Sequence, residues 1–188
     1  MSVIKNNPLL KGASGMLGNV IVYRELRGKL IMSNKPKKVT SLSEAQQTAR
    51  SRFQRAAFYA KRQMSNPETK ALYATGVNDS KFTAFVVALT DYLKAPVIHE
   101  VDASAYTGAS GQAIDVKATD DFQVKSVQVS IDDPTGVSIE KGEATLTVDA
   151  PEQWRYITTA VASLLPGTKI TAYARDVAGN VTAFEILK

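Results

Sequence analysis

The stretch IDVKAT, residues 114–119, alternates apolar with polar side chains. Successive side chains of a β-strand point to opposite faces of the sheet, so this alternation predicts a strand with one buried face. Similar runs recur on both sides of it, with turn-forming residues between them. The runs are 98–101, 114–119, 124–131, 138–142 with 144–148 as a short strand pair, 154–158, 170–175 and 181–187. About seven short strands of this kind predict an antiparallel β-sandwich over residues 96–188.

Residues 1–95 begin with a different pattern. Residues 19–24 and 29–33 are strand-like, and Gly28 can take the positive φ that a tight connection needs, so a β-hairpin is predicted. The glycines that precede it predict turns, because they lack the Gly-Lys-Ser/Thr ending of a phosphate-binding loop. These glycines are Gly12, Gly15 and Gly18. A lone hairpin is marginal in water, so we expect this one to pack on a helix or a partner.

Three helices are predicted after the hairpin, at about residues 41–64, 67–75 and 80–94. Ser41 and Glu44 have the spacing of a capping box for the first helix, and Asp79 or Ser80 would cap the third. The first helix has an apolar stripe at spacings of three and four. Its members are Ala45, Ala49, Phe53, Ala56, Ala60 and Met64. Together with the sandwich, these elements predict an α+β protein.

The charge of the chain changes sign near its midpoint. Residues 1–94 hold 16 Lys and Arg against 5 Asp and Glu, whereas residues 95–188 hold 7 against 13. We therefore expect two domains with different surfaces, divided at Ala95 and Pro96. The first is a basic module of a hairpin and helices at 1–95, and the second is an acidic sandwich at 96–188.

The basic module is the candidate interaction surface. The helix predicted at 41–64 carries five cations and, after Glu44, no acid, so few pairs at i,i+4 can neutralise it. The candidate partner-binding residues are Arg24, Arg27, Lys29, Lys37, Lys38, Arg50, Arg55 and Arg62. An acidic protein surface or assembly is the partner that this charge favours. Nucleic acid is the alternative, although no helix-turn-helix, zinc-finger or RNP motif is present. Charge-driven self-association of the two halves also stays open.

The residues that catalysis or metal binding would need are scarce. The chain has no cysteine, which excludes thiolate chemistry, and His99 is its only histidine. Two acidic pairs could supply calcium ligands, but neither belongs to an EF-hand pattern. They are Asp120 with Asp121 and Asp132 with Asp133. We expect no enzyme activity, no catalytic residue, no metal and no cofactor.

The start of the chain lacks the apolar run of about 7–15 residues that a secretory signal requires. No apolar stretch approaches the roughly 20 residues of a membrane span. We therefore expect synthesis in the cytoplasm and no membrane span. Export by a route that reads no N-terminal signal stays open.

Two resemblances add to this interpretation. Residues 119–121 (TDD), 173–176 (YARD) and 178–180 (AGN) resemble bacterial immunoglobulin-like (Ig-like) domains, and the match covers about 96–188. That resemblance implies an Ig-like sandwich that serves as a spacer or binding module. The whole chain resembles a family of uncharacterised bacterial two-domain proteins through its Gly-rich start, the hairpin segment 18–23 (GNVIVY), Lys35-Pro36 and the Gln/Arg-rich helix. This second resemblance implies a link to phage-tail-like contractile injection systems.

Three functional hypotheses follow. The first is a non-enzymatic interaction protein that docks through its basic module, as a cargo or accessory component of a contractile injection particle. The second is a nucleic-acid-binding protein that uses the same basic face. The third is a small toxin or effector enzyme whose active site would lie in the helical part.

Overall fold

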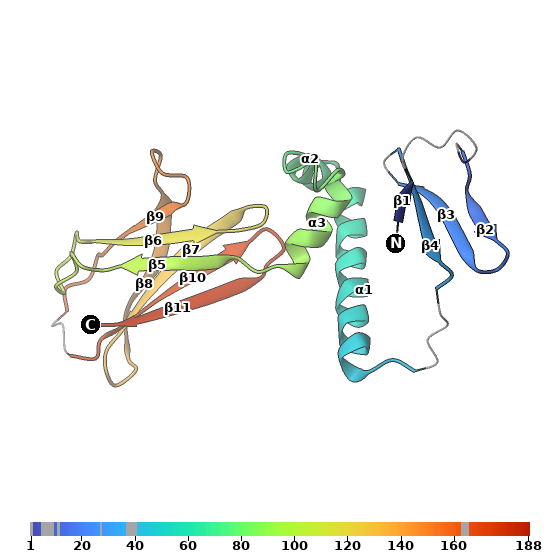
Figure 1. Ribbon diagram of the computed structural model, residues 1–188. Helices are drawn as coiled ribbons and strands as arrows, with labels where there is room; N and C mark the ends of the chain where they lie inside the picture. Colours follow the sequence, from blue (N-terminus) through green and yellow to red (C-terminus); the bar gives the residue numbers. More distant parts are fainter. Residues whose placement is uncertain (1, 5–9, 11, 27, 37–40, 163–165) are drawn as a thin grey trace. The chain divides into compact units, whose positions relative to one another are not determined.

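The computed structural model describes residues 2–4, 10, 12–26, 28–36, 41–162 and 166–188. The chain is an α+β protein of two compact units, Met1–Gln47 and Thr48–Lys188. Each unit is described below by itself. Figure 1 shows the helices and strands of both.

The first unit is built around a four-stranded antiparallel sheet. Its strands lie in the order β1 (Ser2–Ile4), β4 (Lys29–Asn34), β3 (Ile21–Leu26) and β2 (Gly15–Leu17). The β3–β4 pair is the hairpin expected from the sequence, with Leu26 opposite Lys29 and Gly28 at φ 68°.

A second tight turn joins β2 to β3. Gly18 and Asn19 both take a φ of 58°, and the Val20 amide donates to the Leu17 carbonyl at 3.2 Å. Positive φ at both central residues is the geometry of a type I′ hairpin turn. Gly18 therefore serves a turn, as expected.

The second unit contains three helices. They are α1 (Glu44–Ser65), which begins at the end of the first unit, α2 (Pro67–Ala74) and α3 (Ala84–Leu93). Two of them, α1 and α3, begin later in the chain than the sequence predicted. The capping box of α1 is made by Ser43 and Gln46 rather than by Ser41 and Glu44: the Ser43 amide donates to the Gln46 side chain at 3.1 Å, and the Gln46 amide donates to Ser43 Oγ at 3.3 Å.

Helix α3 begins later than the sequence suggested. The Asn78 side chain accepts hydrogen bonds from the amides of Ser80 and Lys81, both at 2.9 Å, and this Asx turn holds the segment outside the helix. Thr83 is the cap instead, because its hydroxyl accepts from the Val86 amide at 3.2 Å. Asn66 caps α2, because its side-chain oxygen accepts from the Glu68 amide at 2.9 Å.

The seven remaining strands form a nearly closed antiparallel sandwich, as the alternating pattern predicted. They are β5 (Val97–Asp102), β6 (Ala113–Thr119), β7 (Val124–Asp132), β8 (Ser138–Leu146), β9 (Gln153–Ile157), β10 (Lys169–Asp176) and β11 (Val181–Leu187). Their order is β11-β10-β7-β8-β9-β6-β5, and β11 also contacts β5. Residues 138–146 form one strand rather than the short pair expected, because β8 pairs with β7 along most of its length and with β9 at its end. Trp154 and Tyr156 point into the core.

Helices α2 and α3 pack on the sandwich through a small second core. The rings of Tyr73 and Phe122 lie 5.0 Å apart, and Gly76 leaves room for Phe122, since a Cβ there would lie 2.6 Å from its ring. Asn180, in the β10–β11 turn, donates from Nδ2 to the Asp91 and Lys94 carbonyls at 3.1 and 3.2 Å. We call the whole contact of α2, α3 and the segment between them with the sandwich the junction.

Because of these contacts, residues 48–95 belong to the same compact unit as the sandwich. The division of the chain falls between residues 47 and 48 rather than between 95 and 96. The apolar stripe expected on α1 is only partly buried: Ala56 and Ala60 are buried, whereas Phe53 keeps 53% of its surface exposed.

Candidate interaction surface

A groove on α1 brings together two of the cations singled out from the sequence. It has a volume of about 430 Å³. Its lining residues are Ser51, Gln54, Arg55, Phe58, Tyr59, Arg62 and Tyr92. Arg55, Phe58 and Arg62 share one face of the helix because their spacings are three and four residues. We call this the basic groove.

The wall and floor of the basic groove are aromatic. Phe58 is 73% exposed, which is unusual for a large apolar side chain, whereas Tyr59 is half-buried. The rings of Tyr59 and Tyr92 lie 5.1 Å apart and are tilted by 34°. The Tyr59 and Tyr73 hydroxyls are 2.7 Å apart, and burial raises the pKa of Tyr59. The floor is therefore fixed by hydrogen bonding, while Phe58 is left open to solvent.

The guanidinium groups of the basic groove find no counter-charge among the residues that the structure describes. Within the described residues, Arg55 and Arg62 are exposed and neither forms an ion pair; the same holds for Arg50, elsewhere on α1. Arg52 differs, because it donates to the Leu93 carbonyl. A free guanidinium group presents a planar set of donors that matches a carboxylate or a phosphate.

The other predicted surface residues lie elsewhere. Arg24 on β3 and Lys29 on β4 are exposed in the first unit. Arg27, Lys37 and Lys38 lie outside the described residues. The groove residues Phe58, Tyr59 and Tyr92 were not predicted from the sequence. Phe58 could have been found from the sequence, since it lies between Arg55 and Arg62 at helical spacing. Tyr92 could not, because it comes from a different helix.

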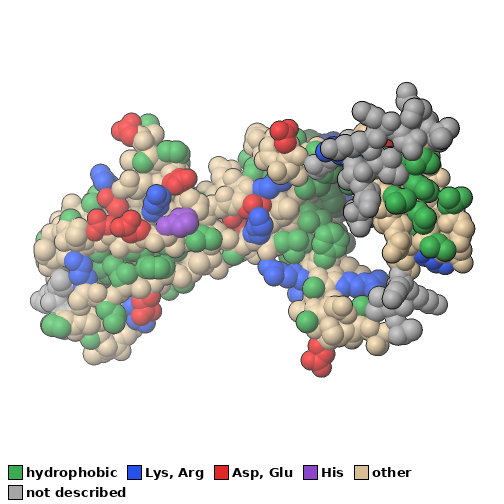
Figure 2. Space-filling view, in the orientation of Figure 1, with side chains coloured by type: hydrophobic (Ala, Val, Ile, Leu, Met, Phe, Trp, Pro, Cys, Tyr) green, Lys and Arg blue, Asp and Glu red, His purple; other side chains and the backbone are tan. Residues whose placement is uncertain are grey.

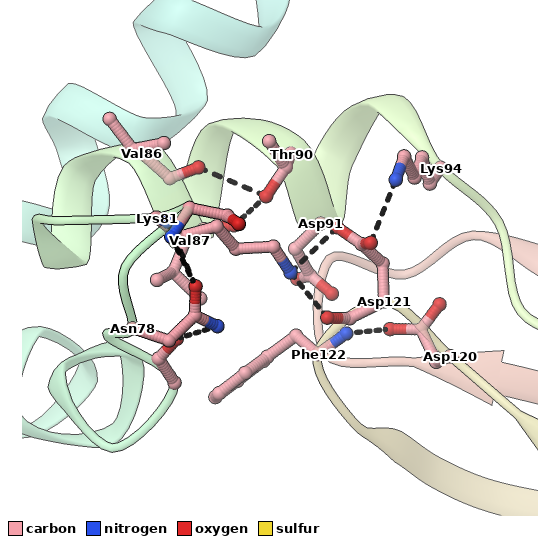
Figure 3. Close-up of polar contacts among 12 residues, drawn as sticks. Asn78, Lys81, Val86, Val87, Thr90, Asp91, Lys94, Asp120, Asp121 and Phe122 are labelled. Atoms are coloured by element: carbon pink, nitrogen blue, oxygen red, sulfur yellow. Dashed lines mark hydrogen bonds and ion pairs between the residues drawn. The ribbon is translucent and has the colours of Figure 1, made fainter.

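Two further cations of the basic half are neutralised at the junction. Lys81 and Lys94 each contact the Asp121 carboxylate at 2.7 Å (Figure 3). Burial alone would raise the pKa of Asp121, but the hydrogen bonds from these two lysines outweigh burial and lower it. Asp121 therefore acts as an ion-pair partner between the helices and the sandwich.

The groups considered for catalysis or metal binding are engaged in local structure. His99 is exposed, and its Nε2 lies 2.6 Å from Thr119 Oγ1. Asp133 accepts from the Thr135 and Val137 amides at 2.8 and 2.9 Å and closes the β7–β8 turn. Within the part of the chain that the structure describes, no group of three His, Asp or Glu side chains could hold a metal ion.

The acidic side chains gather over the strands of the sandwich, beside the histidine (Figure 2). A groove of about 320 Å³ lies there. Its lining residues are Glu100, Asp102, Asp115, Lys117, Ala150, Pro151, Glu152 and Gln153. Arg155 donates two hydrogen bonds to the Asp115 carboxylate, at 2.7 and 2.9 Å, and Lys117 lies 3.9 Å from Glu152. The acids of this groove are thus partly neutralised within the sandwich.

Comparisons with known proteins assign no family to this chain. No family model matches the chain. No curated protein matches it. Among solved structures, CopC from Methylosinus trichosporium OB3b is similar at 17% identity and a TM-score of 0.37, over 49% of this chain and 89% of that chain. A likeness at this level carries no inference about function.

None of the helices in the described residues combines the length and the apolar character that crossing a bilayer requires.

Proposed function

We propose that this protein is a non-enzymatic interaction protein that docks an acidic segment of a partner protein in the basic groove. One observation carries the proposal: Arg55 and Arg62 are exposed without an ion pair among the described residues, on either side of the exposed Phe58. Arginine beside an exposed aromatic ring is typical of the residues that dominate protein interfaces.

The spacing of the two arginines specifies the chemistry of the segment. Seven helical residues rise by about 10 Å, so the Arg55 and Arg62 Cα atoms lie about that far apart along the axis. A partner helix with two acids seven residues apart and an apolar residue between them would place its carboxylates on the two guanidinium groups. The apolar residue would then cover Phe58, which gains from leaving water.

The wider role that we propose is that of a cargo or accessory component of a phage-tail-like contractile injection particle. It is supported by the resemblance of the hairpin and the Gln/Arg-rich helix to bacterial two-domain proteins, as described above. In that role the basic groove would bind the particle, and the sandwich would be carried.

A synthetic helical peptide with two glutamates seven residues apart and a central leucine tests the docking proposal. Fluorescence anisotropy would measure its binding to the full chain, with a peptide of scrambled sequence as the control. We expect the double variant Arg55→Glu/Arg62→Glu to weaken binding by at least about tenfold, and Phe58→Ala to weaken it as well. Arg175→Glu, an exposed arginine on the sandwich, is the matched control and should leave affinity unchanged.

Salt provides a second readout, because exposed charge pairs weaken as the Debye length shortens. Affinity for the peptide should fall as salt is raised. Equal binding of the two peptides, or equal affinity of the double variant and the wild type, would refute docking in the basic groove.

The arrangement of Phe58 between two arginines also favours a second candidate, single-stranded nucleic acid. Bases stack on exposed aromatic rings, and arginine contacts the backbone phosphates. A single-stranded oligonucleotide titrated at low and moderate salt would measure this binding. Retention of oligonucleotide affinity by Phe58→Ala would exclude stacking in the groove, because Phe58 is the exposed ring there.

A further inference from the structure

Two carboxyl groups at the junction each have one buried oxygen that finds no hydrogen-bond partner within the described residues. Asp91 on α3 is fully buried; its Oδ2 accepts from the Tyr73 hydroxyl at 2.7 Å, and its Oδ1 is buried with no partner among the described residues. Asp120, between β6 and β7, accepts from the Phe122 and Gln123 amides on Oδ2, at 2.9 and 3.1 Å, while its Oδ1 is likewise buried without a partner. The Asp120 carboxyl group lies near Asp91 beneath α3 (Figure 3), and its charge helps to raise the pKa of Asp91.

This arrangement is satisfied by one proton. Two ionised carboxylates are both acceptors, so they repel each other and each leaves a buried oxygen without a donor. A single proton turns the pair into a donor and an acceptor, which removes both deficits. We propose that Asp91 and Asp120 share one proton, and that this shared proton stabilises the contact between helix α3 and the β6–β7 segment of the sandwich.

In the part of the chain that the structure describes, the groups that act on Asp91 include no cation. Tyr73 on α2 donates to it, and Tyr59 on α1 is hydrogen-bonded to Tyr73. From the end of β10 comes the Asp176 carboxylate, which accepts from the Gly179 and Asn180 amides and from Asn180 Nδ2.

The two nearby lysines are engaged with Asp121, which follows Asp120 in the chain. They are Lys81, in the segment before α3, and Lys94, at its end. Figure 3 shows Asp91, Asp120 and Asp121 close together beneath α3, with both lysines directed to Asp121. Because no cation of the described residues pairs with these two carboxylates, a bound proton is what reduces their repulsion.

The pKa of Asp91 sets the pH range in which the shared proton is bound. Burial is the largest cause that raises the pKa of Asp91, to about 7, and the Asp176 and Asp120 carboxylates act in the same direction. The folded chain then keeps a proton that the unfolded chain has lost above about pH 4, so stability falls as pH rises from there toward 7. Above that range the two carboxylates repel each other and the contact of α3 with the sandwich weakens.

The test compares thermal unfolding of the full chain, followed by the circular dichroism of its helices, at about pH 5.5 and about pH 8.5. Wild type should unfold at a lower temperature at the higher pH. Asp91→Asn should lose most of that difference, because its amide donates to Asp120 at every pH. Asp149→Asn, at an exposed loop position, is the matched control and should keep the wild-type difference.

Infrared spectroscopy gives a direct readout of the proton. The carbonyl stretch of a protonated carboxylic acid should be present in wild type at about pH 6, disappear by about pH 8.5, and be missing from Asp91→Asn. If Asp91→Asn does not fold, Asp120→Asn serves instead, since its amide supplies the same donor from the other side. A wild type without the acid band at about pH 6, or an Asn variant with the full pH dependence of wild type, would overturn the shared proton.

Discussion

The hydroxyls of Tyr59 and Tyr73 lie 2.7 Å apart and connect the floor of the basic groove to the buried carboxyl group of Asp91. Tyr59 lines the groove, Tyr73 is fully buried, and Asp91 accepts the hydrogen bond that Tyr73 donates. The surface on which docking is proposed is thus supported from below by the junction between the helices and the sandwich.

Removing the Tyr73 hydroxyl should destabilise the second unit. Tyr73→Phe keeps the ring against Phe122 but leaves the Asp91 Oδ2 atom without its donor and Tyr59 without its partner. We expect a loss of about 1–3 kcal/mol in the free energy of unfolding, measured by denaturant titration. Tyr92→Phe, another groove tyrosine, should cost less than about 0.5 kcal/mol. Equal costs for the two variants would contradict the role of the Tyr73 hydroxyl.

Glu140 should stabilise the sandwich with a pH dependence opposite to that of Asp91. It is buried and accepts from the Tyr156 hydroxyl, both donors of Thr159 and the Ala160 amide. Burial alone would raise the pKa of Glu140, but these hydrogen bonds outweigh burial and lower it below its ordinary 4.5. Its contribution to stability is therefore complete above that value and is lost as pH falls further.

Glu140→Gln should cost about 2 kcal/mol near neutral pH, because an amide nitrogen would face donors. The variant should also lose less stability than wild type between about pH 6 and about pH 3, measured by the midpoint of unfolding. Glu143→Gln, on the same strand but exposed, is the control and should behave as wild type in both respects. A Glu140→Gln protein that is as stable as wild type near neutral pH would count against this account.

Gly76 should be intolerant of a side chain. A Cβ atom at this position would lie 2.6 Å from the Phe122 ring and 2.9 Å from Val87 Cγ1. Gly76→Ala should therefore cost about 1–3 kcal/mol, because close-packed cores accommodate added atoms poorly. Phe122→Leu in the same chain should recover part of that loss, and the free energies of the two single variants and the double variant measure the recovery. Strict additivity would show that Phe122 is not the obstacle.

The division of the chain at residue 47 predicts which fragments fold. Residues 41–188 retain the Ser43 cap, the junction and the sandwich, so this fragment should unfold cooperatively and keep the helical signal of its three helices. Residues 96–188 leave out Tyr73 and the α3 carbonyls that bind Asn180. We expect this shorter fragment to be less stable by several kcal/mol or to aggregate, as measured by denaturant titration and gel filtration. Equal stability of the two fragments would restore a boundary near residue 95.

The strands were predictable from the sequence because their signal is local. Alternation in 114–119 needs no knowledge of partners, and it marked the buried face that Ile114 and Val116 occupy. The spacing of Arg55 and Arg62 likewise placed both on one face of α1, where the groove lies. Helix starts were less predictable, because Ser41 and Ser43 are both acceptable caps. The choice depends on which side chain three residues later accepts a hydrogen bond from the backbone amide of the cap, and that side chain is Gln46.

The junction could not be predicted from the sequence, because it depends on contacts between distant segments. Asp91 follows an apolar helical pattern, and nothing near it in the chain indicates a fully buried carboxyl group. Asp120 and Asp121 look alike as neighbours in the sequence, yet Asp120 has a buried oxygen without a partner among the described residues, whereas Asp121 binds two lysines. Tyr92 joins the basic groove from a different helix, so the groove exists only once α1 and α3 have packed together.

The side chain of Asn180 occupies the last backbone acceptors of α3 although it lies 86 positions beyond Lys94. On the ribosome, that helix is synthesised long before the amide that finishes it has left the exit tunnel. The end of α3 must therefore rely on water until the β10–β11 turn that carries Asn180 has emerged. Emergence of that turn, rather than synthesis of the helix itself, sets the moment at which the helices and the sandwich can pack together.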